Sequence, residues 1–271
     1  MKEKYKQLSN ELGANGYEFE TSKYISKGWG LGTSIIGYFI LFILVNIAIN
    51  IAAGLIPLIG AFINSLVVAP AISAGFIVFI HNKHKTGQSN FGLIFSAFNK
   101  VGDLIVLKLI TGVISILLFI PAIISLLGIF SFEDLMAVAS QDPQALKEVM
   151  TSILSNIGEF YGVMSISFLL MMVFGMFMIF TTYFIVLGDL KAIESIKASI
   201  ELVKKNFFPI LGFGILLVLI NLGGMLALGI GIFVSMPVSI AAMYIMFYEI
   251  IGKKVEEGET VGVPGEDVLD A

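Results

Sequence analysis

Arginine and cysteine are both missing from this chain of 271 residues. Without cysteine, the chain has no disulfide and no thiolate metal site. All 16 basic residues are lysines, which excludes the bidentate clamps that guanidinium groups make to phosphate or carboxylate. Charged residues make up only 13% of the chain, against roughly 25% in soluble domains. This composition excludes an ordinary soluble domain, and the net charge of −4 gives no sign of nucleic-acid binding.

The stretch from Gly28 to Ile80 contains no aspartate, glutamate, lysine or arginine. It is long enough for two passes through a bilayer, because each pass needs roughly 20 apolar residues. Residues 1–27 are polar and of mixed charge, without the apolar core and cleavage site of a signal peptide. We therefore expect the first apolar run to be an uncleaved membrane span.

Six apolar segments stand out, at residues 31–56, 57–80, 104–130, 161–187, 208–230 and 233–251. They predict an all-α fold, a polytopic transmembrane helical bundle of six spans with additional amphipathic interfacial helices. The predicted organisation is a cytoplasmic N-terminal segment with a short amphipathic lead-in (1–30), a six-span transmembrane domain (31–251) and an acidic, disordered C-terminal tail (252–271).

The lysines are concentrated on one of the two sides that six spans would create. They are abundant before the first span, between spans two and three, between spans four and five, and after span six. The connection between spans three and four has only Lys147 against five acidic residues. Because lysine enrichment marks the cytoplasmic side, we predict that both termini are cytoplasmic, in a bacterial inner membrane.

Three polar connections carry amphipathic stretches, which are typical of helices in the membrane interface. The first has Phe91, Ile94, Phe95 and Phe98 on one predicted stripe. In the second, Asp142-Pro143 predicts the start of a helix, and an apolar face continues over residues 146–157. The third has its predicted apolar face at Leu190, Ile193, Ile196, Ile200, Val203 and Phe207.

Each pair of spans begins with a similar short segment. These segments are Ser26-Lys27-Gly28-Trp29, Phe98-Asn99-Lys100-Val101 and Lys204-Lys205-Asn206-Phe207. Either a threefold repeat of helical hairpins or the low complexity of apolar sequence explains the likeness.

Ile25-Ser-Lys-Gly-Trp29 and the segment from Ser195 to Phe207 resemble a broad group of bacterial six-span membrane proteins. The group includes the membrane domain attached to some glycerophosphodiester phosphodiesterases. The resemblance covers nearly the whole chain and implies a six-span fold without catalytic residues. Some relatives carry a carotenoid-oxygenase name, but that chemistry needs four histidines around iron, and this chain has two, His81 and His84.

Five polar side chains within the predicted spans are the candidate site residues: Asn46, Asn50, Lys108, Asn221 and Glu249. The three amides either line a path for a polar solute or hydrogen-bond neighbouring helices, at about 0.6 kcal/mol each. Lys108 and Glu249 both fall near the predicted cytoplasmic boundary. Either they form an ion pair or Lys108 extends independently to the lipid headgroups.

Nucleotide-binding loops, catalytic triads, metal-ligand clusters and acid–base carboxylate pairs are not recognisable in the sequence. We therefore predict a non-enzymatic membrane protein without a cofactor, acting as a structural or lipid-associated component of the envelope. The alternative is a transporter or channel for a small solute or lipid. The expected partners are membrane lipids and not nucleic acid, with a homo-oligomer or association with other membrane proteins left open.

Overall fold

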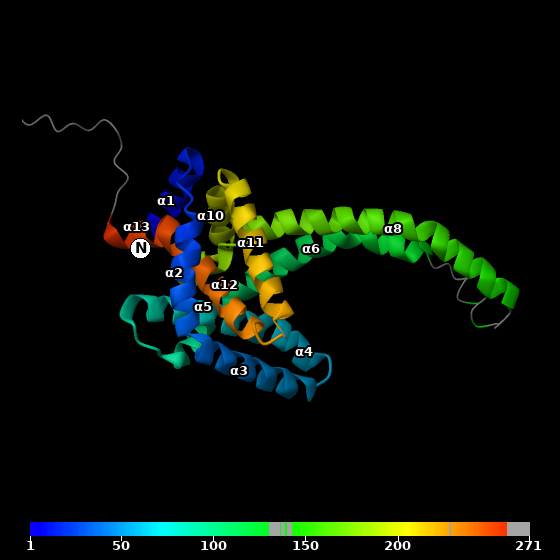
Figure 1. The fold of residues 1–271 in the computed structure, drawn as a ribbon, viewed down its shortest axis with the longest axis horizontal. Coiled ribbons are helices and arrows are strands. Elements are labelled where there is room, and N and C mark those ends of the chain that lie inside the picture. The colour runs from blue at the N-terminus through cyan, green and yellow to red at the C-terminus, as the bar shows by residue number, and fades with distance from the viewer. Residues whose placement is uncertain (130–135, 137–138, 140–142, 228, 259–271) are drawn as a thin grey trace, which may run out of the picture. The chain divides into compact units, whose positions relative to one another are not determined.

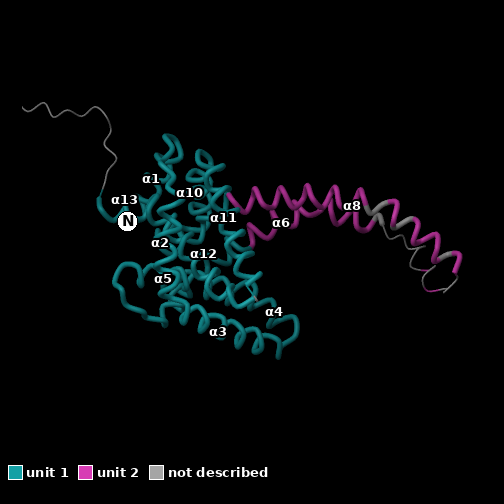
Figure 2. The backbone as a smooth tube through the Cα atoms, viewed as in Figure 1, with its two compact units in different colours: residues 1–108, 177–271 teal, residues 109–176 magenta. Residues whose placement is uncertain are grey.

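The computed structural model describes residues 1–129, 136, 139, 143–227 and 229–258, which contain helices and no β-strand (Figure 1). The chain divides into two compact units (Figure 2). Unit 1 is Met1–Lys108 with Phe177–Ala271, and unit 2 is Leu109–Met176. The elements are α1 (Lys2–Asn15), α2 (Thr21–Ser34), α3 (Ile36–Gly54), α4 (Ile59–Ile63), η1 (Asn64–Val68), α5 (Ala69–Thr86), η2 (Phe91–Lys100), α6 (Val101–Ile129), α8 (Pro143–Met178), α9 (Thr181–Val186), α10 (Ala192–Lys204), α11 (Phe207–Leu226), α12 (Ile232–Phe247), η3 (Tyr248–Gly252) and α13 (Lys253–Glu257).

Six helical segments are long and apolar enough to cross a membrane. They are Ile36–Gly54, Ile59–Thr86, Phe91–Leu127, Gly158–Val186, Phe207–Leu226 and Ile232–Glu257. Each overlaps one of the six predicted spans, so the prediction of an all-α, polytopic membrane protein is confirmed. The predicted domain boundaries at residues 30 and 252 fall inside α2 and at the end of η3, respectively. Most of the predicted acidic tail, residues 259–271, lies outside the described residues.

Helix α12 is the most buried span of unit 1, and α2 packs closely along it. Two glycines one helical turn apart, Gly28 and Gly32, allow this contact. A Cβ atom on Gly28 would lie 2.5 Å from Ala242 Cα, and one on Gly32 would collide with Val238. Small residues spaced by four let two membrane helices approach backbone to backbone. Since residue 28 meets residue 242 and residue 32 meets residue 238, the two helices run antiparallel.

An aromatic cluster joins α1, α9 and α12. The Phe247 ring stacks on Tyr5, with centroids 6.2 Å apart, and meets Phe184 edge-on at 5.2 Å. Phe184 and Phe247 are almost completely buried, as is Tyr5. Burial of rings in such geometries stabilises a core beyond the area that they bury. The N-terminal helix is therefore part of the core of unit 1.

The predicted stripe on residues 91–98 is only partly buried. Ile94 and Ala97 are buried against α5, where Gly75 makes room for the backbone of Ile94. Phe95 and Phe98 are exposed. The prediction of one common face is wrong because η2 is a 3₁₀ helix. With three residues per turn, positions 94 and 97 share one face, and positions 95 and 98 lie on another.

The predicted helix before the fifth span forms as α10, and the protein buries only part of its predicted apolar face. Leu190 and Val203 are buried, whereas Ile193 and Ile200 are exposed. The buried positions are mostly small: Ala192, Ser195, Ala198, Ser199, Leu202 and Val203. Small side chains are needed because α10 packs closely on α1 and α9. A Cβ atom on Gly13 of α1 would lie 2.5 Å from the Glu201 carbonyl oxygen.

Unit 2 consists of parts of α6 and α8 with the connection between them. Helix α8 begins at Pro143, as predicted, while the expected cap Asp142 lies outside the described residues. On the predicted amphipathic stretch, Val149 is buried and Met150 is exposed. The side chains of Ile153 and Ile157 also lie outside the described set, so that face stays a prediction.

Candidate functional site

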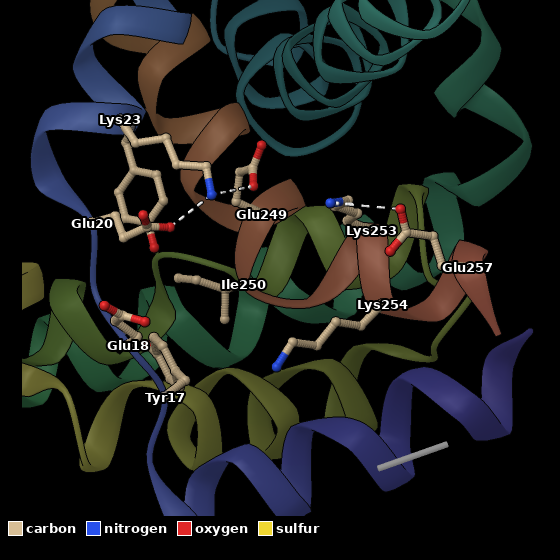
Figure 3. Close-up of a pocket in the computed structure, with 10 residues that line it drawn as sticks. Tyr17, Glu18, Glu20, Lys23, Glu249, Ile250, Lys253, Lys254 and Glu257 are labelled. Atoms are coloured by element: carbon tan, nitrogen blue, oxygen red, sulfur yellow. Dashed lines mark hydrogen bonds and ion pairs between the residues drawn. The ribbon is translucent and has the colours of Figure 1, made fainter. Parts of the chain in front are cut away.

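The Glu249 carboxylate is the centre of a charged cluster in unit 1. It lies on the π-helical turn η3, and its side chain is only 7% exposed. One carboxylate oxygen is 2.5 Å from Lys27 Nζ, and the other is 3.1 Å from Lys23 Nζ. Figure 3 shows Lys23 between Glu249 and Glu20, whose carboxylate is 2.7 Å from the same ammonium. Turns of π-helix are rare and occur frequently at functional sites.

These contacts give Glu249 lysine partners different from the predicted one. Lys23 and Lys27 come from α2, whereas Lys108 lies exposed on α6. Of the two alternatives for Lys108 and Glu249, the ion pair between them is not the one that these contacts favour, since the Glu249 carboxylate lies between two α2 lysines. Antiparallel packing of α2 on α12 explains the pairing, because residues that precede Gly28 face residues that follow Ala242. Two lysines spaced by four directly before a glycine pair were the sequence signal that could have indicated it.

Two histidines share the hydroxyl of a buried tyrosine beside this cluster. The Nδ1 atoms of His81 and His84 lie 2.9 and 3.1 Å from Tyr244 Oη. Since a hydroxyl carries one proton, at least one imidazole must donate its own N–H to the oxygen. Both histidines are half-buried and lie on helix α5. Among the residues that the structure describes, no three histidine, aspartate or glutamate side chains could hold a metal ion.

A second ion pair lies beside the two histidines. Lys85 forms an ion pair with Glu256 and donates to Tyr248 Oη over 3.0 Å. The Tyr248 hydroxyl in turn donates to Glu256 over 3.0 Å. These bonds join α5 to η3 and α13. With Lys23 and Lys27 on α2, they define what we call the lysine-rich end of unit 1.

Three hollows open at the lysine-rich end. The first, of about 250 Å³, is drawn in Figure 3 and is lined partly by Glu18, Lys23 and Lys254. The second, of about 400 Å³, is lined by Lys27, Leu31, Ser34, Lys83, His84 and Ile245. The third, of about 280 Å³, is lined by Lys27, His84, Lys85, Tyr248, Glu249 and Lys253. Lys27 and His84 border both the second and the third hollow, so these two are neighbours.

The candidate asparagines are engaged in hydrogen bonds to their own unit. The Nδ2 groups of Asn46 and Asn50 donate to carbonyl oxygens one turn earlier, each over 2.8 Å. Asn64 donates to Asn50 Oδ1 over 3.0 Å, and Asn221 donates to Ser239 Oγ over 2.8 Å. The last two bonds connect neighbouring helices, which fits the interpretation of these amides as interhelical hydrogen bonds. Asn221 Oδ1 is buried without a partner among the described residues.

The three helices that lead into spans one, three and five have exposed apolar side chains. We call α2, η2 and α10 the lead-in helices, because they are followed by α3, α6 and α11. Trp29, Phe95 and Ile193 on these helices are each more than half exposed. A lysine lies nearby in sequence on each: Lys27, Lys100 and Lys197. Lys27 and Trp29 lie in the first of the three similar segments noted in the sequence, and Lys100 lies in the second.

Ion pairs also fix the lead-in helix α10 and the turn before it. Glu194 contacts Lys2 Nζ at 2.9 Å and accepts from the Lys191 backbone N–H. The Lys2 hydrogen bond is the main cause that lowers the pKa of Glu194 below its usual value. Asp189 forms an ion pair with Lys100 of η2, and this hydrogen bond lowers the pKa of Asp189. Helices α1, η2 and α10 are thereby connected through charge.

No protein-family model, curated protein or solved structure matches the chain. The resemblance to bacterial six-span membrane proteins therefore stays a prediction.

Proposed function

We propose that this protein is a non-enzymatic, lipid-associated component of a bacterial inner membrane, with both termini in the cytoplasm. The observation that carries the proposal is the set of three lead-in helices, each with exposed apolar side chains and a nearby lysine at the start of a span. Aromatic side chains collect at the level of lipid headgroups, and lysines accompany them on the cytoplasmic side. Amphipathic helices of this kind lie in the membrane interface.

The buried side of the lead-in helices supports the same function. Each is already packed against the core of unit 1: α2 on α12, η2 on α5, and α10 on α1 and α9. The exposed apolar side chains on these helices are therefore not covered by the protein itself. Trp29, Phe95 and Ile193 would each lose contact with water if lipid covered them, which favours membrane association at about 25 cal/mol per Å² of apolar surface.

The alternative function is transport of a small solute or lipid. It is less well supported because Asn46, Asn50 and Asn221 donate to groups within unit 1, which leaves fewer donors for a passing solute. The buried Asn221 Oδ1 is the group that such a path would use.

Reconstitution into vesicles tests the proposal, because Trp29 is the single tryptophan of the chain. Its fluorescence should be quenched strongly by lipids brominated near the headgroup, and weakly by aqueous acrylamide or by lipids brominated at the chain end. Strong quenching by acrylamide alone would show that α2 does not lie in the interface. The same vesicles should show no flux of a panel of solutes. A flux that is lost in Asn221→Leu would favour transport instead.

A further inference from the structure

We propose that the second hollow of the lysine-rich end, between α2, α5 and α12, binds a negatively charged phosphate group. The inference rests on the proposed lipid association and names the ligand chemistry of one site. Two lysines, Lys27 and Lys83, and the imidazole of His84 line this hollow of about 400 Å³. Its other lining residues are Leu31, Ser34 and Ile245, so its wall contains no carboxylate. Lysine binds phosphate as a compact point charge with three donors.

The positive charge around Lys27 and Lys83 is not fully neutralised by nearby carboxylates. Lys83 donates to the Gly87 carbonyl over 2.8 Å, and it forms no ion pair within the described part of the chain. Lys27 is paired with Glu249, and the neighbouring Lys23 is paired with both Glu249 and Glu20, so two carboxylates stand against these two lysines and the unpaired charge of Lys83 is in excess. An anion placed between Lys27 and Lys83 would therefore meet attraction that local acids do not fully cancel.

The hollow also lies where the phosphates of a lipid leaflet are expected. Lys83 and His84 are in the last turn of the candidate span Ile59–Thr86, and Leu31 and Ser34 directly precede the candidate span Ile36–Gly54. Anionic headgroups attract basic groups at this level of the membrane. Leu31 and Ile245 supply an apolar wall beside the cations. A phosphate attached to an acyl-bearing glycerol fits this combination better than a free phosphate does.

Lipid binding to the purified full-length protein provides the test, with native mass spectrometry as the readout. Phosphatidylglycerol should bind more tightly than phosphatidylcholine. Lys83→Gln should weaken phosphatidylglycerol binding about tenfold, the equivalent of one charge-assisted hydrogen bond. The matched control is Lys254→Gln, which removes the same charge from the first hollow and not from the second. It should change binding less than about twofold.

A second variant keeps the test independent of how well Lys83→Gln folds. Ser34 is exposed, so Ser34→Glu places a carboxylate in the hollow without disturbing the core, and it should weaken phosphatidylglycerol binding by repulsion. Equal weakening by Lys83→Gln and Lys254→Gln, or no effect of Ser34→Glu, would overturn the hollow as a site while leaving general lipid association intact. Failure of the wild-type protein to retain any lipid would instead overturn the proposed function.

Two further experiments distinguish the phosphate of a lipid headgroup from that of a free phosphate compound. Inorganic phosphate should compete poorly with phosphatidylglycerol, and Leu31→Ser should weaken lipid binding and leave any binding of inorganic phosphate unchanged. Displacement of the lipid by inorganic phosphate, with the same sensitivity to Lys83→Gln, would assign the hollow to a free phosphate compound. Both results support a phosphate site and differ in the molecule that fills it.

Discussion

The two lysines around Glu249 should contribute to stability cooperatively. Each lysine is between one third and one half exposed, so Lys23→Gln or Lys27→Gln alone leaves the carboxylate one partner and should cost about 1 kcal/mol of unfolding free energy. The double variant leaves a carboxylate that is 7% exposed without either lysine. An uncompensated buried charge costs roughly 3–5 kcal/mol.

Protonation of the glutamate sets a ceiling on this loss. At pH 7, adding a proton to an ordinary glutamate costs about 3.5 kcal/mol, since each pH unit above its pKa is worth about 1.36 kcal/mol. We therefore expect the double variant to lose about 3 kcal/mol, clearly more than the two single losses added together. Adding Glu249→Gln to the double variant should recover most of that loss, because no charge then remains to be compensated.

Equilibrium unfolding in mixed micelles at pH 7 measures these differences. Lys204→Gln is the matched control, because Lys204 pairs with Glu201 on an exposed helix surface and should cost less than about 0.5 kcal/mol. Single losses that add to the double loss within about 0.5 kcal/mol would refute the cooperative cluster. A triple variant no more stable than the double variant would refute it independently.

Three other outcomes follow from the structure. Gly28→Leu should destabilise the protein by about 3 kcal/mol or more in thermal melts, because its Cβ would meet Ala242, whereas Gly30→Ala, with open space around it, should be neutral or stabilising. In the cysteine-free chain, Gln141→Cys should react with an impermeant reagent from outside intact cells and Gln88→Cys should not; the reverse pattern would invert the proposed topology. The folded-state pKa of Glu194 is lowered, so its stabilisation is present above the unfolded pKa of about 4.3 and is lost as pH falls through the folded value. Glu194→Gln should therefore flatten the acid limb of an unfolding curve, and an unchanged limb would contradict this.

Composition was sufficient to predict the spans, because crossing a membrane depends on length and apolarity alone. The side-chain partners were harder to predict. Lys108 and Glu249 were matched by depth, but depth does not determine which helix lies beside which. The actual neighbours followed from Gly28 and Gly32, whose small size decides the closest helix contact.

Hydrophobicity alone also failed to identify the buried face of the lead-in helix α10. Hydrophobicity placed Ile193 and Ile200 on one apolar face with Leu190 and Val203, yet close packing buries a face that contains Ala192 and Ser195 and leaves the two isoleucines exposed. In a membrane protein, isoleucine is as stable against lipid as against protein, so hydrophobicity does not distinguish the two sides. Side-chain size is the better guide there.

The contact between α2 and the end of α12 can form only after nearly the whole chain has been synthesised. Lys27 and Glu249 are 222 residues apart in the chain. At 5–20 residues per second, a ribosome takes roughly 10–45 s to synthesise the intervening chain. During that time the glycine face of α2 and its two lysines have already been made, while the helix that will cover them has not. The residues of α2 are thus among the first to be made, and their contacts with α12 and η3 are among the last to form. A chain released before Glu249 is synthesised would leave Lys23 and Lys27 without this carboxylate.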